Sequence, residues 1–199
     1  MPTPRFIVTC ALVAIAALSL SGCGINNIPT YEEKAKAEWS QVQNQYKRRA
    51  DLIPNLVETV KGFAAQEKDV LTSVVEARAK ATQTTLTPDM LTNPEAVKSF
   101  EANQSALSGA LSRLLVTVER YPNLKSNENF LALQSQLEGT ENRISVARRD
   151  YIEAVRLYNT ELKTFPGRIW ASILYAANEP MVTFQVAPED TVNPEVKFD

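Results

Sequence analysis

Apolar residues recur at alternating intervals of three and four over most of the chain, a spacing that places them on one face of an α-helix. The first such stripe begins near Tyr31 and fades at about residue 80. It passes through Pro54. Because proline removes one backbone hydrogen bond and crowds the preceding turn, we expect one long helix that is kinked near this residue. The apolar members of the stripe are Trp39, Val42, Tyr46, Ile53, Leu56, Val60, Phe63, Val70 and Val74.

Two further stripes complete the helical pattern. One covers residues 97–121, and the other keeps an unbroken spacing of seven from Phe130 to Phe165, which is typical of coiled-coil packing. A short apolar helix is predicted over residues 168–177. Short turns between long helices favour antiparallel neighbours, so the predicted fold is all-α: an up-and-down four-helix bundle of three long helices and one short one.

The bundle is predicted to cover residues 31–178. Residues 23–30 are predicted as a tether, since Pro29 disfavours a helix before it. Residues 179–199 are predicted as an extended tail, rich in proline and acidic residues, whose MVTFQV segment has nothing obvious to pair with.

The first 22 residues have the layout of an export signal. A positive end at Arg5 precedes an uncharged apolar run of 15 residues, 6–20, which is short for a permanent membrane span. The following Leu-Ser-Gly-Cys, ending at Cys23, resembles the lipobox of bacterial lipoproteins. This resemblance implies cleavage before Cys23, diacylglycerol on its thiol and an acyl chain such as palmitate on the new amino terminus. The alternatives are a chance cysteine after an ordinary secretion signal and a signal kept as a transmembrane anchor.

A lipid on Cys23 would make the membrane a direct partner, because more than one acyl chain gives stable anchoring. The domain would then lie in the cell envelope and face the periplasm or the exterior. Gly24 occupies the position where Asp favours retention in the inner membrane. By resemblance to lipoprotein sorting, we expect the outer membrane rather than the inner one if the host has both.

The charge and composition of the chain limit the partners, cofactors and reactions that we expect. The chain has 21 Lys and Arg against 23 Asp and Glu, a near balance unlike the basic surfaces that bind nucleic acids, so no nucleic-acid partner is expected. It has no histidine, which removes the commonest general base and the Glu-x-x-His element of di-iron bundles. Its two cysteines, Cys10 and Cys23, both precede the bundle. We therefore expect no metal, no cofactor and no catalytic activity, and no small-molecule ligand is evident.

Several stretches of the chain carry a resemblance to a known family. Residues 39–66 read WSQVQNQYKRRADLIPNLVETVKGFAAQ and are similar to the signature first helix of the LemA family. The similarity is extended by RYPNLKSNENF at 120–130, by residues 141–159 and by the PEVKF tail at 194–198. The resemblance implies a four-helix bundle in a bacterial extracytoplasmic protein that an N-terminal segment holds at the membrane. It implies no established catalysis and no agreed site residues. The lipobox departs from the family's common transmembrane anchor.

The densest polar cluster consists of Arg48, Arg49 and Asp51. Arg49 falls on the first apolar stripe, where a charge must find a partner or reach solvent. We interpret it as half of a buried ion pair to a carboxylate from another helix, such as Glu138 or Glu141, that fixes the register of the bundle. The alternative is that the cluster contacts an envelope partner.

Two classes of function remain. The first is a membrane-anchored scaffold or adaptor for other envelope proteins. The second is a hydrolase or ligand carrier that uses carboxylates in a cleft. The lack of His, of a reactive Cys and of any nucleophile motif favours the first.

The substitution Cys23→Ala tests the anchor. We expect it to abolish both fatty-acid incorporation and signal processing, because the thiol is the site of acylation. Metabolic labelling with a fatty acid and the gel mobility of the product measure both. Continued labelling of the variant, or the same mature species on the gel, would show that Cys23 is not the lipid attachment site.

Overall fold

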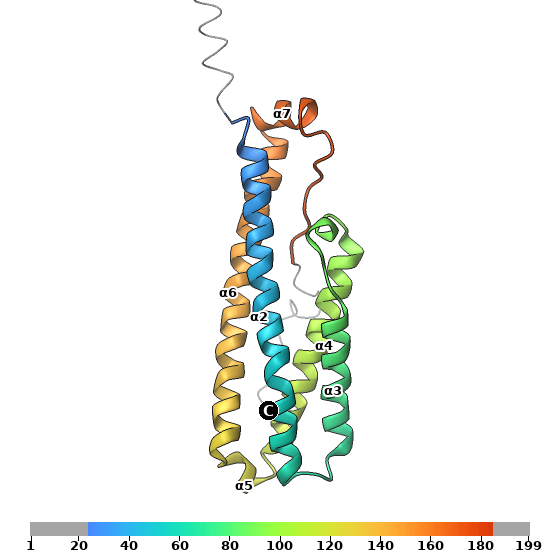
Figure 1. Ribbon diagram of the computed structural model, residues 1–199, viewed down its shortest axis with the longest axis vertical. Helices are drawn as coiled ribbons and strands as arrows, with labels where there is room; N and C mark the ends of the chain where they lie inside the picture. Colours follow the sequence, from blue (N-terminus) through green and yellow to red (C-terminus); the bar gives the residue numbers. More distant parts are fainter. Residues whose placement is uncertain (1–23, 185–199) are drawn as a thin grey trace, which may run out of the picture.

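Four helices lie alongside one another in the computed structural model, which describes residues 24–184. They are α2 (Asn27–Phe63), α3 (Lys68–Gln83), α4 (Pro94–Val118) and α6 (Glu128–Lys163). Three short helices connect or follow them: η1 (Pro88–Met90), α5 (Pro122–Lys125) and α7 (Gly167–Ile173). Successive long helices run in opposite directions, and no strand occurs among the described residues (Figure 1). The all-α, up-and-down four-helix bundle is thus confirmed.

The first apolar stripe belongs to two helices, not one. Helix α2 continues through Pro54 but ends at Phe63, and the chain reverses over residues 64–67 before α3 begins. Contacts from far along the chain hold this reversal: the Tyr121 hydroxyl donates to Glu67 Oε1 at 2.6 Å, and Arg120 Nη2 lies 3.0 Å from the same oxygen. The fourth helix of the bundle is therefore α3, not the short helix predicted over residues 168–177. That short helix does form, as α7, but it is not one of the four bundle helices.

The predicted tether is partly helical. Helix α2 begins at Asn27, so Pro29 occupies its third position. Proline is tolerated there because an N–H in the first turn has no acceptor within the helix. Ile28 is fully buried, and Asn27 Nδ2 donates to Glu161 Oε1 near the end of α6 at 3.1 Å. The start of α2 is thereby fixed to the end of α6.

The apolar core falls into two clusters along the bundle. One cluster contains Trp39 and Tyr46 of α2 with Ile144 and Tyr151 of α6. The other is centred on residues 53–60 of α2 and on residues 107–118 of α4 and includes Leu137 of α6. Between them, α2, α4 and α6 each place a polar residue at the core: Arg49, Gln104 and Thr140.

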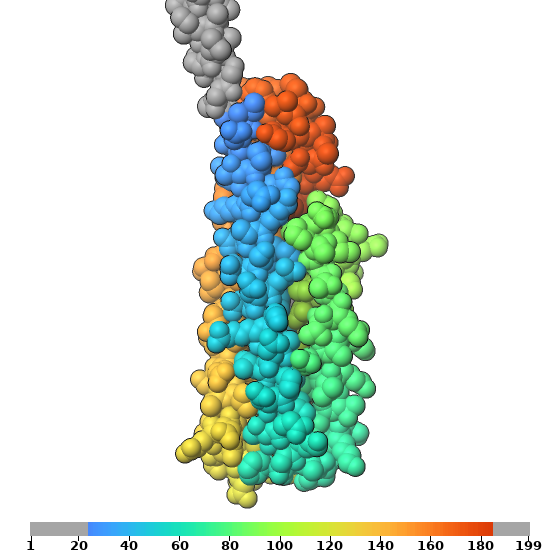
Figure 2. Space-filling view, in the orientation of Figure 1, coloured from blue at the N-terminus to red at the C-terminus, as the bar shows by residue number. Residues whose placement is uncertain are grey.

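The C-terminal segment packs on the bundle where α3 and α4 do not reach (Figures 1 and 2). Tyr151 of α6 donates to the Val182 carbonyl at 3.0 Å, and Asn159 makes two hydrogen bonds to the Met181 backbone. Phe184 packs against the rings of Trp39 and Tyr151. The described part of the predicted tail, through Phe184, has no helix or strand and covers the core. The rest of that prediction, residues 185–199, lies outside the described residues.

Two aromatic residues assigned to apolar stripes are exposed. Phe165 is 80% exposed because α6 ends at Lys163, so the chain leaves the helix before the last position of the spacing of seven. Phe63 is 44% exposed at the last residue of α2. A periodic pattern does not show where a helix ends, and both errors lie at helix ends.

Candidate functional site

Arg49 is the most deeply buried charged side chain among the described residues, with 2% of its side chain exposed. Its Nη1 donates to Glu141 Oε1 on α6 and to Ser108 Oγ on α4, both at 2.8 Å. Its Nη2 donates to Gln104 Oε1 at 2.7 Å and to the Gln104 carbonyl at 3.3 Å. Glu141, one of the two expected partners, therefore pairs with Arg49.

Gln104 extends this network to the fourth helix of the bundle. While its Oε1 accepts from Arg49, its Nε2 donates to the Ala81 carbonyl in the last turn of α3 at 3.2 Å. A continuous set of hydrogen bonds therefore joins α2, α3, α4 and α6. Because burial strengthens electrostatic attraction and penalises unpaired groups, this polar layer favours one alignment of the helices.

Gln104 is a site residue that was not predicted from the sequence, although a signal for it was present. The stripe on α4 has Phe100 and Leu107 seven residues apart, and Gln104 fills the position between them that the alternation of three and four requires. Thr140 fills the equivalent position between Leu137 and Ile144 on α6. A polar residue at a core position on each of three helices predicts a polar layer.

Arg48, Arg49 and Asp51 do not form one site. Arg49 points into the bundle, whereas Arg48 and Asp51 are exposed. Asp51 pairs with Lys47, one helical turn earlier, at 3.7 Å between Nζ and Oδ2. Both of these side chains are more than half exposed, so the pair contributes little stability. Residues adjacent in sequence point to different sides of a helix, which separates the cluster.

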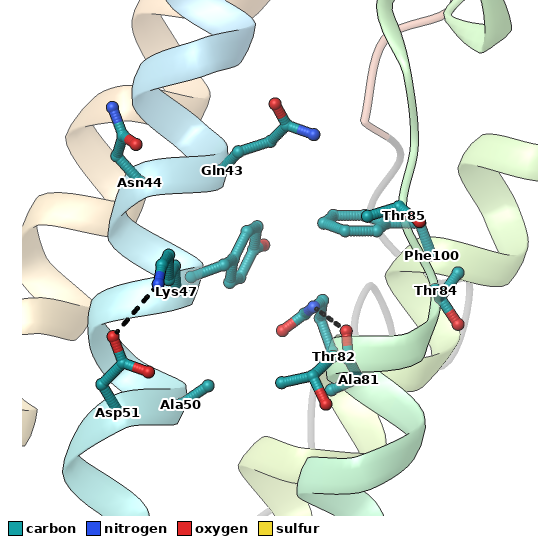
Figure 3. Close-up of a pocket in the computed structure, with 12 residues that line it drawn as sticks. Gln43, Asn44, Lys47, Ala50, Asp51, Ala81, Thr82, Thr84, Thr85 and Phe100 are labelled. Atoms are coloured by element: carbon teal, nitrogen blue, oxygen red, sulfur yellow. Dashed lines mark hydrogen bonds and ion pairs between the residues drawn. The ribbon is translucent and has the colours of Figure 1, made fainter.

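A groove opens beside the polar layer, between α2 and the end of α3 (Figure 3). Its volume is about 370 Å³. Tyr46 and Phe100, whose rings meet edge to face at 5.3 Å, supply its aromatic surface. Its other lining residues are mainly amides, hydroxyls and small side chains, with Lys47 and Asp51 as its charged members: Gln43, Asn44, Ala50, Ala81, Thr82, Thr84, Thr85 and Gln104.

Most polar side chains in the groove are already used in structural hydrogen bonds. Gln43 Nε2 donates to the Leu86 carbonyl at 2.9 Å, and the Thr82 hydroxyl donates to backbone carbonyls of its own helix. Thr84 Oγ1 accepts from Asn103 at 2.8 Å. Asp51 is the one carboxylate that lines the groove within the described part of the chain. The groove therefore offers shape, aromatic surface and neutral polar groups rather than a pair of carboxylates.

Burial controls the protonation of the tyrosine in this groove. It raises the pKa of Tyr46, although the nearby guanidinium groups of Arg148 and Arg49 oppose the shift. The Arg49 guanidinium carbon lies 5.1 Å from the centre of the Tyr46 ring. Because its pKa is raised above an ordinary value near 10, the Tyr46 hydroxyl stays protonated at neutral pH and is not available as a general base.

Over residues 24–184, Asp, Glu, His and Cys nowhere gather in a group of three that could hold a metal ion. In the same part of the chain, no helix combines the length and apolar character needed to cross a bilayer. Cys23, the expected lipid attachment site, and the preceding signal lie outside the described residues.

The amino-acid sequence that forms this bundle matches a known protein family. The chain belongs to the LemA family, whose family model matches residues 38–198. It is also similar to Magnetosome protein MamQ 1 and MamQ 2 of Paramagnetospirillum magneticum, with 23% identity over 188 residues, covering 86% of this chain and 69% of each relative. Magnetosome protein MamQ of Magnetospirillum gryphiswaldense is 23% identical over 184 residues, covering 81% of this chain and 68% of the relative.

A double-mutant cycle tests the polar layer. Arg49→Met should cost about 1–3 kcal/mol of unfolding free energy, because it leaves the buried Gln104 oxygen without a donor. Gln104→Leu should cost about 3 kcal/mol, because it removes hydrogen bonds from a buried charge. The double variant should be more stable than the sum of the two losses predicts, by about 1–3 kcal/mol. Urea unfolding followed by circular dichroism measures all three.

Arg48→Met is the matched control. It removes the same charge from the neighbouring, exposed position and should change the unfolding free energy by less than about 0.5 kcal/mol. Strict additivity of the Arg49 and Gln104 variants would show that the two side chains do not act as a unit.

Proposed function

We propose that this LemA family protein is a membrane-anchored, extracytoplasmic adaptor that holds another envelope protein in the groove between α2 and α3. It acts by binding and positioning, without catalysis. Its anchor is the lipid on Cys23, and its destination in a host with two membranes is the outer one. The occupant of the groove is an extended segment of a partner polypeptide.

The character of the groove supports this proposal most directly. Its single described carboxylate, Asp51, is exposed and paired with Lys47, so the groove lacks the two facing carboxylates that glycoside hydrolysis uses. This observation disfavours the alternative of a carboxylate-based hydrolase. An aromatic surface bordered by amides and hydroxyls instead suits a peptide, whose side chains seek apolar contact and whose backbone seeks hydrogen bonds.

The position of the groove also suits an adaptor. Its back wall includes Gln104, which the polar layer fixes, so the binding surface is organised before a partner arrives. A rigid surface loses little entropy on association, which favours affinity. On its outer side, Asn44 and Thr85 are exposed and lie on opposite walls, one from α2 and one from the linker after α3 (Figure 3).

Site-specific cross-linking tests the proposal in the full-length protein in its native envelope. A photoreactive p-benzoylphenylalanine at position 44 or at position 85 should capture the same envelope protein, because both side chains face one groove. The same amino acid at Ser135, which is exposed on α6 and does not line the groove, should not capture that protein. Mass spectrometry of the adducts identifies the partner.

A second pair of variants separates groove binding from chance proximity. Thr82→Trp places a large side chain in the groove and should abolish the adduct, whereas Thr82→Val keeps the side-chain size and should preserve it. If positions 44 and 85 capture no common protein, or if Thr82→Trp leaves the adduct unchanged, the groove does not hold a partner. Activity that requires Asp51 would instead support the hydrolase alternative.

A further inference from the structure

Exposed apolar side chains gather at one end of the bundle. Phe165 is 80% exposed, Ile169 is 44% exposed, Ile173 is 67% exposed and Leu174 is 54% exposed. Phe165, Ile169 and Ile173 are spaced four residues apart, and the latter two lie on one face of α7. Such a group differs from the single exposed apolar residues that are common on soluble surfaces, because it is concentrated within ten residues of the chain.

The fold holds this face outward. The other side of α7 packs on the core through Trp170 and Ala171, so the helix cannot turn its exposed face inward without exposing these residues. Gly167 at the start of α7 fits closely against α6: a Cβ at this position would lie 2.2 Å from the Glu161 carbonyl oxygen. Only glycine permits this close approach. The contact between Gly167 and α6 fixes α7 across the end of the bundle.

The chain enters the bundle at the same end. Gly24, the first described residue, lies against Pro166, since a Cβ on Gly24 would be 3.4 Å from Pro166 Cγ. Figure 1 shows the start of α2 beside α7, at the end opposite α5. In sequence, Gly24 directly follows Cys23 and the apolar run over residues 6–20. A membrane that holds this N-terminal segment would therefore lie next to α7.

The charges around α7 suit a lipid surface. Residues 162–178, which lie between Glu161 and Glu179, contain no Asp or Glu, and Lys163 and Arg168 among them are exposed. Glu161 is half-buried and accepts a hydrogen bond from Asn27. Apolar side chains bordered by basic ones are typical of segments that lie in the interface of a bilayer with anionic lipids. Trp170 and Tyr175 lie between the exposed face and the core. Tryptophan and tyrosine are enriched at the interface between a bilayer and water.

We propose that Phe165, Ile169, Ile173 and Leu174 insert into the headgroup region of the membrane that carries the N-terminal anchor. This inference rests on the membrane anchoring in the proposed function and adds a second point of contact. One anchor lets a domain tumble, whereas two contacts fix its orientation. The groove, which begins at Gln43, lies about 16 residues along α2 from Asn27 and is thus held roughly 24 Å from the membrane-facing end.

Tryptophan quenching by lipids tests this contact in the full-length protein. The chain has two tryptophans: Trp39, which is fully buried in the core, and Trp170 on α7. In vesicles of phosphatidylcholine and phosphatidylglycerol with brominated acyl chains, we expect the emission to be quenched relative to unbrominated vesicles. Trp170→Phe should remove this quenching, which assigns the signal to α7.

Two double variants locate the contact. Ile173→Asp with Leu174→Asp should abolish the quenching, because it places charge in the apolar face. Val116→Asp with Leu131→Asp makes the same change at exposed positions near the α5 end of the bundle, 72% and 48% exposed, and should leave the quenching unchanged. Equal melting temperatures for the wild type and both variants would show that the fold is kept.

Vesicle flotation separates the two proposals. A protein that does not float with vesicles would contradict the membrane anchoring and, with it, this contact. A protein that floats but whose emission the brominated lipids do not quench would overturn the α7 contact alone. Quenching that survives Ile173→Asp with Leu174→Asp would also overturn it. If the face instead forms a dimer between two copies, cross-linking through α7 without lipid quenching would reassign it.

Discussion

The structure depends on one buried charge. Arg49 lies in the middle of the bundle, where a charge removed from water is costly unless it is paired: both of its Nη groups are hydrogen-bonded, whereas its buried Nε has no partner among the described residues. Its partners come from α4 and α6, and Gln104 passes the hydrogen bonding on to α3. Apolar stripes alone can slide past one another by a helical turn with little loss of burial. Glu141, Ser108 and Gln104 all contact Arg49 in the alignment observed, and the need to keep these contacts favours one register of the bundle.

The same layer links the fold to the proposed function. It divides the core into two apolar clusters, and at this level the groove opens between α2 and α3. Gln104 belongs to both the layer and the groove wall, so the hydrogen bonds of the layer also shape the groove. The clusters differ in how they are closed. The one nearer α5 is enclosed by the helices, whereas the one nearer α7 uses Met181 and Phe184 of the C-terminal segment. Helix α7 and the start of α2 lie at that second end.

The sequence predicted the parts of this structure that repeat. The spacing of seven from Phe130 onward predicted α6. The position of Arg49 on an apolar stripe predicted that it pairs with a carboxylate from another helix, and Glu141 was one of the two residues named as candidates. The reversal at residues 64–67 was not predictable from periodicity, because α2 and α3 bury faces of the same kind and the stripe continues through the turn. Glu67 is held there by Arg120 and Tyr121, which are more than 50 residues away. The packing of Phe184 on Trp39 likewise depends on a long-range contact.

Hydrogen exchange of the Arg49 side chain shows whether its partners hold this residue inside the bundle. In the protein labelled with ¹⁵N in arginine, we expect the Nη protons of Arg49 to exchange with water far more slowly than those of the exposed Arg48. We also expect Gln104→Leu to accelerate the exchange at Arg49 without affecting Arg48. Equal exchange rates for Arg49 and Arg48 in the unmodified protein would contradict this expectation, because they would place the Arg49 guanidinium in solvent.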